Sequence, residues 1–433
     1  MRWFPIVTIA LAVTLQACAS APATMPVTPA ALAPAAVAPA VAEARSPITI
    51  LISIDGFRPD YLTRGVTPNL SRLAAQGVEA AMRPSFPSKT FPNHYALVTG
   101  LRPDRNGITA NKMEDPSRPG EVFTMASDDP FWWNEGKPIW VDAEQAGIRT
   151  ATMFWPGSNV AVGGTKAREW PYEISGGVRP SDWQQYNEAI GTTQRINTML
   201  DWMRRPATIR PRLATLYFEG VDTAGHVFGP DDARTTAAVA AVDATIGQLV
   251  DGLAAIGQPA NLVIVADHGM AATSSTRTIA LDRILTPGDY RLIETGPYAS
   301  LEAVKGHEAS LEAKLLVPHE HMTCWRKGEI PARLHYGSNP RVPPYLCLAQ
   351  TGWQVADKAP RRAESGGNHG FDNASPEMAA LFIANGPAFA PGRTIAPFDN
   401  VDVYALLRDL IGLPAASGVD GTDTVFKPVL VGR

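Results

Sequence analysis

The sequence has no strong excess of charge of either sign. Its 433 residues include 38 lysines and arginines against 42 aspartates and glutamates, which gives a net charge of −4 at pH 7. A protein that tracks long nucleic acids through a basic groove needs a marked positive excess, so this balance argues against that class. It still permits small anionic substrates held through a metal ion. With 45% hydrophobic and 18% charged residues, the composition is that of an ordinary globular protein.

Long apolar runs are also scarce. The one at the N-terminus, Phe4–Leu15, is too short to span a bilayer comfortably and indicates a signal peptide over residues 1–18. Residues 15–18 read LQAC and resemble a bacterial lipobox, in which Cys18 would be acylated. Gln16 departs from the usual small residue, so secretion with cleavage near Ala17 or Ala19 is the alternative. We therefore expect export to the periplasm, as a lipoprotein or as a soluble protein, and no later membrane-spanning helix.

Cysteine is rare as well, and Cys324 and Cys347 are the only two after Cys18. In an exported chain they predict one disulfide, with two unpaired thiols as the alternative. Such a bond between residues 23 positions apart would contribute roughly 3 kcal/mol in the chain-entropy model. Residues 19–47 consist almost wholly of Ala, Pro, Val and Thr. Their prolines interrupt any helix, which predicts a disordered tether, with helical Ala runs as the alternative.

Short β-rich apolar runs alternate with helical patterns from residue 48 onward, as in α/β proteins with a mostly parallel sheet. Strands are expected at residues 48–54, 212–218, 262–266 and 378–384. Helices are expected from Pro68 to a stop at Gly77, with Thr67 as the N-cap, at residues 93–99, and at residues 231–256.

Aspartates follow three of these predicted strands, two of them have a histidine nearby, and a further histidine lies in a glycine-rich loop. These residues are Asp55, Asp222, His226, Asp267, His268 and His369. Ligands collect beyond the carboxyl ends of strands in open α/β sheets, and Asp with His suits a divalent metal. Six such ligands could hold two ions about 4 Å apart, an arrangement that serves phosphoryl transfer. The alternative is a set of unrelated solvated turns.

Candidate nucleophiles and aromatic side chains lie between these strands. Ser85, Ser88 and Thr90 precede the helix predicted at residue 93, where a hydroxyl gains from donor amides and the helix dipole. The residues themselves do not choose among the three. Residues 121–202 are rich in aromatic side chains, which either pack in the core or stack a planar base at about 1–3 kcal/mol per base.

Together these residues resemble the nucleotide pyrophosphatase/phosphodiesterase family of the alkaline phosphatase superfamily. The resemblance covers the chain from about residue 48 to its end. It implies an α/β fold with an alkaline-phosphatase-like three-layer core: a mostly parallel central sheet, helices on both faces and an inserted cap region. Residues 48–433 would form the phosphodiesterase catalytic domain. The matching blocks are IDGFR from Ile54, PSKTFPNHY from Pro87, LVTGL from Leu97, Gly107-Ile108 with Asn111, FWPG from Phe154, Asp222 with Gly225-His226, ADHGM from Ala266 and GNHG from Gly367.

The resemblance also implies a role for each site residue. Thr90 would be the nucleophile of a hydrolase that cleaves nucleotide pyrophosphate and phosphodiester bonds through a covalent phospho-threonine, releasing nucleoside monophosphates. Asn111 and the Phe91 backbone N–H would donate to a phosphate oxygen. One zinc ion would be held by Asp55, Asp267, His268 and the Thr90 oxygen, and the other by Asp222, His226 and His369. The nucleoside pocket would consist of Phe91, Phe123, Trp155, Tyr172 and Tyr217, and Phe123 stands where a Leu is more familiar.

Three other functions compete with this interpretation. A phosphomonoesterase on the same scaffold would need further cations near the phosphate, and Lys89, Lys112 and Lys166 are candidates. A lysophospholipid or choline-phosphate diesterase would use the aromatic pocket for an acyl chain or a quaternary ammonium. An inactive binding or adhesion protein would be expected to have lost a metal ligand, whereas this chain has the complete set.

Overall fold

The computed structural model describes residues 45–432, which lie in one compact unit. The predicted signal segment, Cys18 and residues 19–44 of the predicted tether lie outside the described residues. Near the first described residue, the Arg45 guanidinium donates to the Met203 carbonyl at 2.8 Å. The first strand, β1 (Ile48–Ile54), follows three residues later and matches its prediction.

A nine-stranded sheet forms the centre of this unit. Its order is β20-β2-β19-β10-β1-β9-β5-β8, and β21 also pairs with β2. The strands from β10 to β8 run parallel, whereas β19 is antiparallel to both of its neighbours. The sheet is therefore mixed and mostly parallel, which confirms the predicted fold class. Besides β1, its strands are β2 (Val78–Arg83), β5 (Thr150–Met153), β8 (Asp182–Gln184), β9 (Leu213–Phe218), β10 (Ala260–Val265), β19 (Ala380–Asn385), β20 (Arg393–Thr394) and β21 (Phe398–Asp399).

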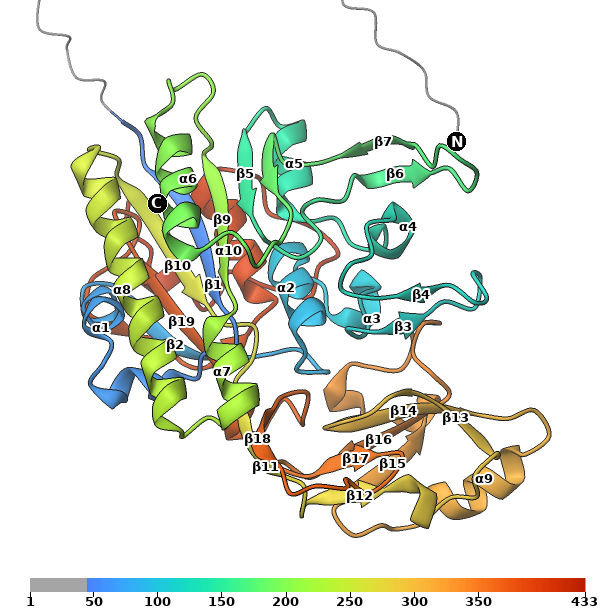
Figure 1. Ribbon diagram of the computed structural model, residues 1–433. Helices are drawn as coiled ribbons and strands as arrows, with labels where there is room; N and C mark the ends of the chain where they lie inside the picture. Colours follow the sequence, from blue (N-terminus) through green and yellow to red (C-terminus); the bar gives the residue numbers. More distant parts are fainter. Residues whose placement is uncertain (1–44, 433) are drawn as a thin grey trace, which may run out of the picture. The chain divides into compact units, whose positions relative to one another are not determined.

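Helices cover the sheet from two sides (Figure 1). All seven residues of β1, ITILISI, are buried, as expected for a parallel strand with both faces covered. On one side α8 contacts α1, α6 and α7, and on the other α10 contacts α2 and α5. The helices are α1 (Pro68–Ala75), α2 (Thr90–Thr99), α3 (Pro103–Asn106), α4 (Pro130–Trp133), α5 (Ile139–Gln145), α6 (Thr192–Arg204), α7 (Gly220–Phe228), α8 (Ala233–Ala255), α9 (Glu308–Leu315) and α10 (Asp402–Ile411).

Two helix N-termini differ from their predictions. Helix α2 begins at Thr90, three residues before the predicted start, so Thr90 is itself in the first turn. At α1, the Thr67 hydroxyl donates to the Leu62 carbonyl and caps nothing. The buried carboxylate of Asp243, from α8, instead accepts from the backbone N–H of Leu70 at 2.8 Å. Sequence patterns near residue 67 cannot reveal a cap supplied by a side chain 173 residues away.

Helix α8 is the one described segment long and apolar enough to cross a bilayer, with a mean hydropathy of 1.3 in its most apolar window, although no such segment is expected after residue 18. The helix contacts α1, α6 and α7, and its apolar residues Ile246 and Leu249 are fully buried. Asp243 lies on the same buried side. These contacts are those of a core helix in a globular domain.

The chain leaves the central sheet for two hairpins and for one large insert. Residues 107–138 form the hairpin β3–β4 and α4, and residues 154–181 form the hairpin β6–β7, with strands β3 (Met113–Glu114), β4 (Val122–Phe123), β6 (Val162–Lys166) and β7 (Ile174–Val178). Residues 271–368, here called the insert, leave through β11 and return through β18, which pair with each other. The strands of the insert are β11 (Ala271–Ser274), β12 (Thr278–Ala280), β13 (Tyr290–Glu294), β14 (Tyr298–Ala303), β15 (Met322–Arg326), β16 (Tyr345–Ala349), β17 (Gln354–Ala356) and β18 (Ser365–Asn368).

The insert is built on its own small sheet. Strands β13, β14, β16 and β15 lie side by side in that order, all antiparallel (Figure 1). Cys324 of β15 and Cys347 of β16 are directly opposite each other and form a disulfide, which confirms the predicted pairing. Apolar side chains of the insert, such as Leu301 and Leu315, pack into a cluster separate from the main core.

Candidate active site

Three adjacent parallel strands deliver the predicted acids to one edge of the sheet. Strand β1 lies between β10 and β9, so the carboxyl ends of all three emerge together. Asp55 follows β1 directly, Asp267 lies two residues after β10, and Asp222 lies in the first turn of α7, after β9. The topology therefore brings together carboxylates that are as much as 212 positions apart in the sequence.

The first group comprises Asp55, Asp267, His268 and Thr90. The Nε2 atom of His268 lies 2.9 Å from Asp267 Oδ2, 3.5 Å from Asp55 Oδ1 and 3.3 Å from Thr90 Oγ1. Asp267 and His268 are fully buried, and the Gly56 N–H donates to Asp267 Oδ1 at 3.2 Å. This is the set predicted for one metal ion, and its members converge around the His268 ring.

The second group comprises Asp222, His226 and His369. Asp222 and His226 are four residues apart on α7 and therefore share one face of the helix. The His226 Nε2 atom lies 3.5 Å from Asp222 Oδ2, and the His369 Nε2 atom lies 3.6 Å from Asp222 Oδ1. The His369 ring stacks on the His268 ring with centroids 3.5 Å apart, so the two groups adjoin.

Backbone carbonyls fix the orientation of all three histidines. The Nδ1 atoms of His226, His268 and His369 lie 2.9–3.0 Å from the carbonyls of Gly367, Gly269 and Ser88, respectively. When Nδ1 carries the ring hydrogen, Nε2 is unprotonated and its lone pair faces the carboxylates. Metal-binding histidines are held in this manner, because the second ring nitrogen sets the tautomer.

The electrostatics of the site favour the binding of cations. Asp55 Oδ1, Asp222 Oδ1 and Asp267 Oδ2 are buried and have no hydrogen-bond partner among residues 45–432. Burial, with the nearby carboxylates of Asp267 and Asp222, raises the pKa of Asp55 well above its usual value. Burial also raises the pKa of Asp222 to about 6 and lowers that of His226 to about 4. Crowded carboxylates beside neutral imidazoles are a donor set that fits divalent metal ions.

His94 lies close to the same carboxylates but has a structural role. Its Nδ1 atom lies 2.9 Å from the Thr90 carbonyl, and its Nε2 atom lies 2.8 Å from Ser53 Oγ. Both ring nitrogens are therefore engaged, and burial lowers the pKa of His94 to about 3, which keeps the ring neutral. Asp55, His94 and Asp267 are close enough to hold an ion, yet His94 instead fixes the first turn of α2.

The structure distinguishes among the three candidate nucleophiles. Ser85 Oγ donates to the Asn400 side chain at 2.8 Å, and Ser88 Oγ donates to the Phe371 carbonyl at 3.1 Å. Thr90 instead lies in the first turn of α2 with its hydroxyl beside His268. Of the three hydroxyls, that of Thr90 therefore adjoins the proposed metal ligands.

The expected pair of phosphate donors is arranged differently from the prediction. The Phe91 backbone N–H donates to Asn111 Oδ1 at 3.0 Å, so it is not free for a phosphate oxygen. The same bond fixes the Asn111 amide, and no described residue accepts from its Nδ2 group. Asn111 lines the cavity described next, where its NH₂ group is available as a donor.

A cavity of about 550 Å³ connects the metal ligands to a group of aromatic side chains. Asp55, Thr90, Asp222, His226 and His369 line one end, with Asn111 beside them. The other end is lined by Phe91, Trp133, Phe154, Trp155, Tyr186 and Tyr217. Asp267 and His268 lie fully buried beneath this surface. A substrate with a phosphate at one end and a flat ring system at the other would match both ends.

Three of the residues predicted to bind the nucleoside have other surroundings. Phe123 is fully buried and packs against Phe91 and Trp133, with ring centroids 6.1 and 5.5 Å away, so it supports the pocket wall from behind. Tyr172 is 54% exposed and lines a separate surface depression beside Lys166. Tyr217 lines the cavity, but its hydroxyl donates to Asp55 Oδ2 at 2.6 Å, so it orients a candidate metal ligand.

Three aromatic residues line the cavity but are absent from the predicted nucleoside pocket: Trp133, Phe154 and Tyr186. Tyr186 is the most exposed of the three. It lies two residues after the edge strand β8, is 41% exposed, and meets Phe154 edge to face at 5.4 Å and Tyr217 at 6.0 Å. Tyr186 thus lines the catalytic cavity, as predicted for Tyr172. Both tyrosines belong to the same aromatic-rich stretch, and no periodic pattern there separates a wall residue from an exposed one.

Comparisons with known proteins agree with this site. Residues 49–372 match the model of the family described as type I phosphodiesterase/nucleotide pyrophosphatase. A Schizosaccharomyces pombe pyrophosphatase/phosphodiesterase is 36% identical over 84% of this chain and 77% of its own length. A Xenopus laevis bis(5'-adenosyl)-triphosphatase is 36% identical over 85% of this chain and 78% of its own length. Mouse ectonucleotide pyrophosphatase/phosphodiesterase family member 1 is also 36% identical, but only 41% of its length is covered.

A solved structure supports the same relationship. An inactive variant of murine ectonucleotide pyrophosphatase/phosphodiesterase 5, in complex with AMP, superposes with a TM-score of 0.81. It is 32% identical in sequence, and the match covers 89% of this chain and all of that one. Sequence, fold and site therefore lead to one conclusion: the chain is a hydrolase that belongs to the type I phosphodiesterase/nucleotide pyrophosphatase family.

Proposed function

We propose that this protein is a zinc-dependent enzyme that cleaves nucleotide pyrophosphate and phosphodiester bonds and releases nucleoside monophosphates. The observation that carries the proposal is the Thr90 hydroxyl, which adjoins two Asp/His groups at one end of a cavity whose other end is aromatic. AMP bound to the murine structural relative supports a small nucleotide as the substrate.

The residues of the site suggest how the two ions would be held. Asp55, Asp267, His268 and the Thr90 oxygen would bind one zinc, and Asp222, His226 and His369 the other. Bound zinc would lower the pKa of a coordinated hydroxyl and stabilise negative charge on the phosphate and the leaving oxygen. The oxygens Asp55 Oδ1, Asp222 Oδ1 and Asp267 Oδ2 support this assignment, since none accepts a hydrogen bond from a described residue.

The covalent step would use the chain's own hydroxyl. Thr90 Oγ would lose its proton and form a bond to phosphorus while the bond to the leaving oxygen breaks, giving a nucleotidyl-threonine. Water would then attack the same phosphorus, restore the Thr90 hydroxyl and release the nucleoside monophosphate. The Asn111 NH₂ group would donate to a non-bridging oxygen, and removing such a donor costs roughly 10²–10³ in rate.

Charge at the cavity favours a diester over a monoester. Among the described residues that line it there is no lysine or arginine. Lys166 pairs with Asp128 at 2.9 Å, Lys112 is exposed, and the buried Lys89 ammonium lies 5.9 Å from the Tyr298 ring centre. A monoester dianion would therefore find no lysine or arginine on the described cavity wall for its second charge, whereas a diester anion carries only one charge at phosphorus.

Aromatic walls would serve the second substituent of the diester. A base stacked on Tyr186 and Phe154 would contribute about 1–3 kcal/mol. Glu188 and Glu219 also line this end, and Arg195 holds Glu219 with two hydrogen bonds of 2.6 and 2.8 Å. The aromatic and acidic groups here would also suit a quaternary ammonium, which makes a choline-phosphate diester the second candidate substrate.

We further propose export to the bacterial periplasm, with residues 1–18 as the leader and residues 19–47 as a tether before the catalytic domain at residues 48–433. The short apolar segment at the N-terminus supports this, and so does the Cys324–Cys347 disulfide, which persists in oxidising compartments. Acylation of Cys18 would attach the protein to a membrane.

One purified preparation tests the proposal. It should contain about two zinc ions per chain, lose activity with a strong chelator and regain it with zinc. Against ATP, a bis-aryl phosphate diester, an aryl phosphate monoester and a lysophospholipid, kcat/KM for a nucleoside phosphodiester or ATP should exceed that for the monoester at least about 10²-fold. Equal efficiencies would favour the monoesterase, the best rate on the lysophospholipid would favour the lipid diesterase, and full activity in metal-free protein would remove the mechanism.

A further inference from the structure

The segment that carries Asn111, residues 107–115, is held by side chains of the insert. Before Asn111, the Tyr336 hydroxyl donates to the Thr109 carbonyl at 3.0 Å, and Arg341 Nη1 donates to the Gly107 carbonyl at 2.8 Å. These contacts cross from the insert to the catalytic domain. The backbone just before Asn111 is therefore held at two carbonyl groups, each by a residue more than 220 positions away in the sequence.

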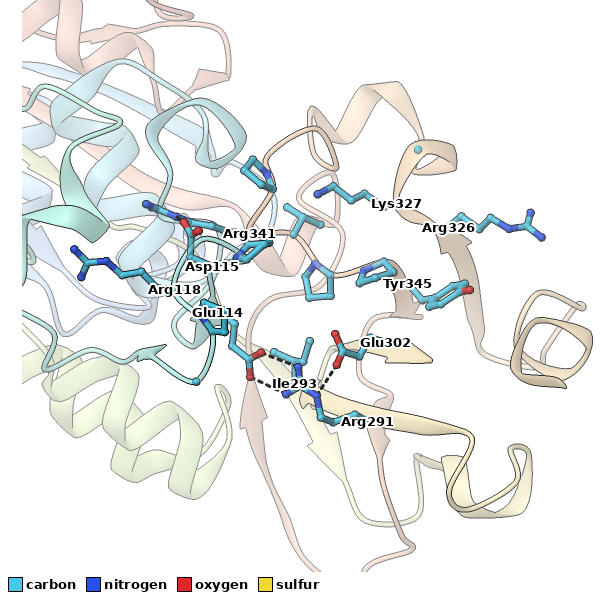
Figure 2. A pocket seen from close by; sticks show the side chains of 18 residues that line it. Glu114, Asp115, Arg118, Arg291, Ile293, Glu302, Arg326, Lys327, Arg341 and Tyr345 are labelled. Atoms are coloured by element: carbon cyan, nitrogen blue, oxygen red, sulfur yellow. Dashed lines mark hydrogen bonds and ion pairs between the residues drawn. The ribbon is translucent and has the colours of Figure 1, made fainter. Parts of the chain in front are cut away.

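Charged contacts from the insert fix the segment after Asn111 as well. Arg291 of β13 makes two parallel hydrogen bonds of 2.7 Å to Glu114, the last residue of β3 (Figure 2). Its Nε atom also donates to Glu302 at 2.7 Å, so the guanidinium is oriented within the insert before it reaches Glu114. Arg341 Nε donates to Asp115 Oδ2 at 2.8 Å. Bidentate arginine–carboxylate pairs fix direction as well as distance.

Burial strengthens the Arg341 contact. Arg341 is 3% exposed and Asp115 is 7% exposed, and the guanidinium also donates to the carbonyls of Phe131 and Trp132. The Arg341 side chain therefore contacts the hairpin β3–β4 segment and α4 together. Both elements lie beside the aromatic end of the catalytic cavity, because Trp133 of α4 lines it.

We propose that Arg291, Arg341 and Tyr336 are positioning residues for catalysis, which hold the Asn111 amide where it meets the phosphate. This inference rests on the proposed function, since it assigns Asn111 a phosphate oxygen. Asn111 is bonded to α2 through the Phe91 N–H, and the insert clamps the chain on both sides of it. No described residue of the insert is a proposed metal ligand, so the insert bears on the site through this clamp and through β18, which leads to His369.

A cavity of about 700 Å³ beside this clamp suggests a ligand site as the rival interpretation (Figure 2). Its cations are already engaged by protein groups. Arg326 pairs with Glu312 and Glu329, Arg118 pairs with Asp129, and Lys327 donates to the Asn339 carbonyl. An anionic ligand would have to displace these partners, so the charges in the cavity serve to join segments of the protein.

Of the three clamp residues, Arg291, Tyr336 and Arg341, the exposed Arg291 provides the main test, because its substitution should leave the fold intact. Arg291→Gln should lower kcat for a nucleoside phosphodiester about 5- to 10-fold with KM nearly unchanged, since small misplacements of a catalytic group are costly. Arg326→Gln is the matched control: Arg326 is 46% exposed against 45% for Arg291, lines the same cavity and also binds two carboxylates, but both lie within the insert. It should change kcat less than about 2-fold.

The coupling to Asn111 is measured in a double-mutant cycle. Adding Arg291→Gln to Asn111→Ala should lower kcat less than about 2-fold further, because the group to be positioned is already absent. Arg291→Lys should restore part of the rate through its charge. The unfolding midpoints of Arg291→Gln and Arg326→Gln should agree, so that a loss of rate is not a loss of folded protein.

The outcomes separate the inference from the proposed function beneath it. If Asn111→Ala alone leaves kcat unchanged, the proposed role of Asn111 is wrong, and the clamp has nothing to position. If Asn111→Ala is slow but Arg291→Gln matches Arg326→Gln, the positioning inference is overturned and the role of Asn111 stands. Full additivity of Arg291→Gln and Asn111→Ala would also overturn it, because Arg291 would then act elsewhere.

Discussion

The two ends of the catalytic cavity are built on different kinds of structure. The metal end rests on β1, β9 and β10, and its acids are fixed by strand order and by backbone carbonyls that orient the histidines. The aromatic end is assembled from unlike segments: Phe91 and Trp133 lie on helices, whereas Phe154 and Tyr186 lie just after the strands β5 and β8. Its principal exposed ring, Tyr186, meets the rings of Phe154 and Tyr217. The proposed chemistry thus lies at the ends of central strands, and the proposed substrate choice depends partly on loop segments, which vary more readily.

The largest effect expected from this comparison is at the metal end. Thr90→Ala should lower kcat at least about 10³-fold, because it removes the atom that bonds to phosphorus. Metal content, measured by elemental analysis, should stay nearly unchanged, since six other ligands remain. Thr90→Ser should retain part of the rate.

Two buried hydroxyls provide the controls for Thr90. Ser85→Ala and Ser88→Ala each remove one hydrogen bond of the segment that precedes α2. Each should lower the free energy of unfolding by about 0.5–1.5 kcal/mol and leave kcat nearly unchanged. If either serine variant is inactive while Thr90→Ala still turns over substrate, the assignment of Thr90 as the nucleophile is wrong.

A smaller effect is expected at the aromatic end. Tyr186→Ala should lower kcat/KM for a nucleotide about 10-fold, since it removes one stacking surface. A small diester without a base should be affected much less. Tyr172→Ala is the matched control, with the same change of side chain on an exposed tyrosine outside the cavity, and should stay within about 2-fold of the parent. A larger loss for Tyr172→Ala would restore that residue to the pocket.

The smallest expected effect is on the stability of the metal-free protein. Asp267 is fully buried, and burial raises its pKa well above the usual value, so its ionised form destabilises the metal-free fold. Asp267→Asn should therefore raise the unfolding free energy of chelated protein by about 1 kcal/mol near pH 8, although the variant should bind less zinc.

The sign of the pH dependence follows from linkage. An acid whose pKa is raised by folding contributes stability below its unfolded pKa and loses that contribution as pH rises through the folded pKa. The advantage of Asp267→Asn should thus disappear as pH falls below the raised pKa of Asp267. Thermal melts of both chelated proteins across pH 4–8 measure it, and an advantage that grows toward acid pH would contradict the assignment.

The sequence predicts the metal end of the cavity better than the aromatic end. Asp55, Asp222 and Asp267 each follow a strand with a clear apolar pattern, and the topology of parallel strands then requires them to meet. Tyr172 and Phe123 lie where no periodicity exists, so their side-chain directions depend on packing that only the fold reveals. The Asp243 cap of α1 and the Phe91–Asn111 hydrogen bond are likewise contacts between distant or irregular segments.

The pairing of β11 with β18 has a consequence for how this enzyme could be rebuilt. Ala271 lies opposite Asn368, so the insert begins and ends at hydrogen-bonded neighbours and is joined covalently to the rest of the domain at one place. Lengthening its outer loops should cost little, because closure entropy grows only slowly with loop length. Deleting one residue from β18 would be severe, because a register slip of one reverses every side chain and would turn His369 away. Engineers who graft a new module onto this scaffold should therefore keep the pairing of residues 271–274 with residues 365–368 and vary what lies between.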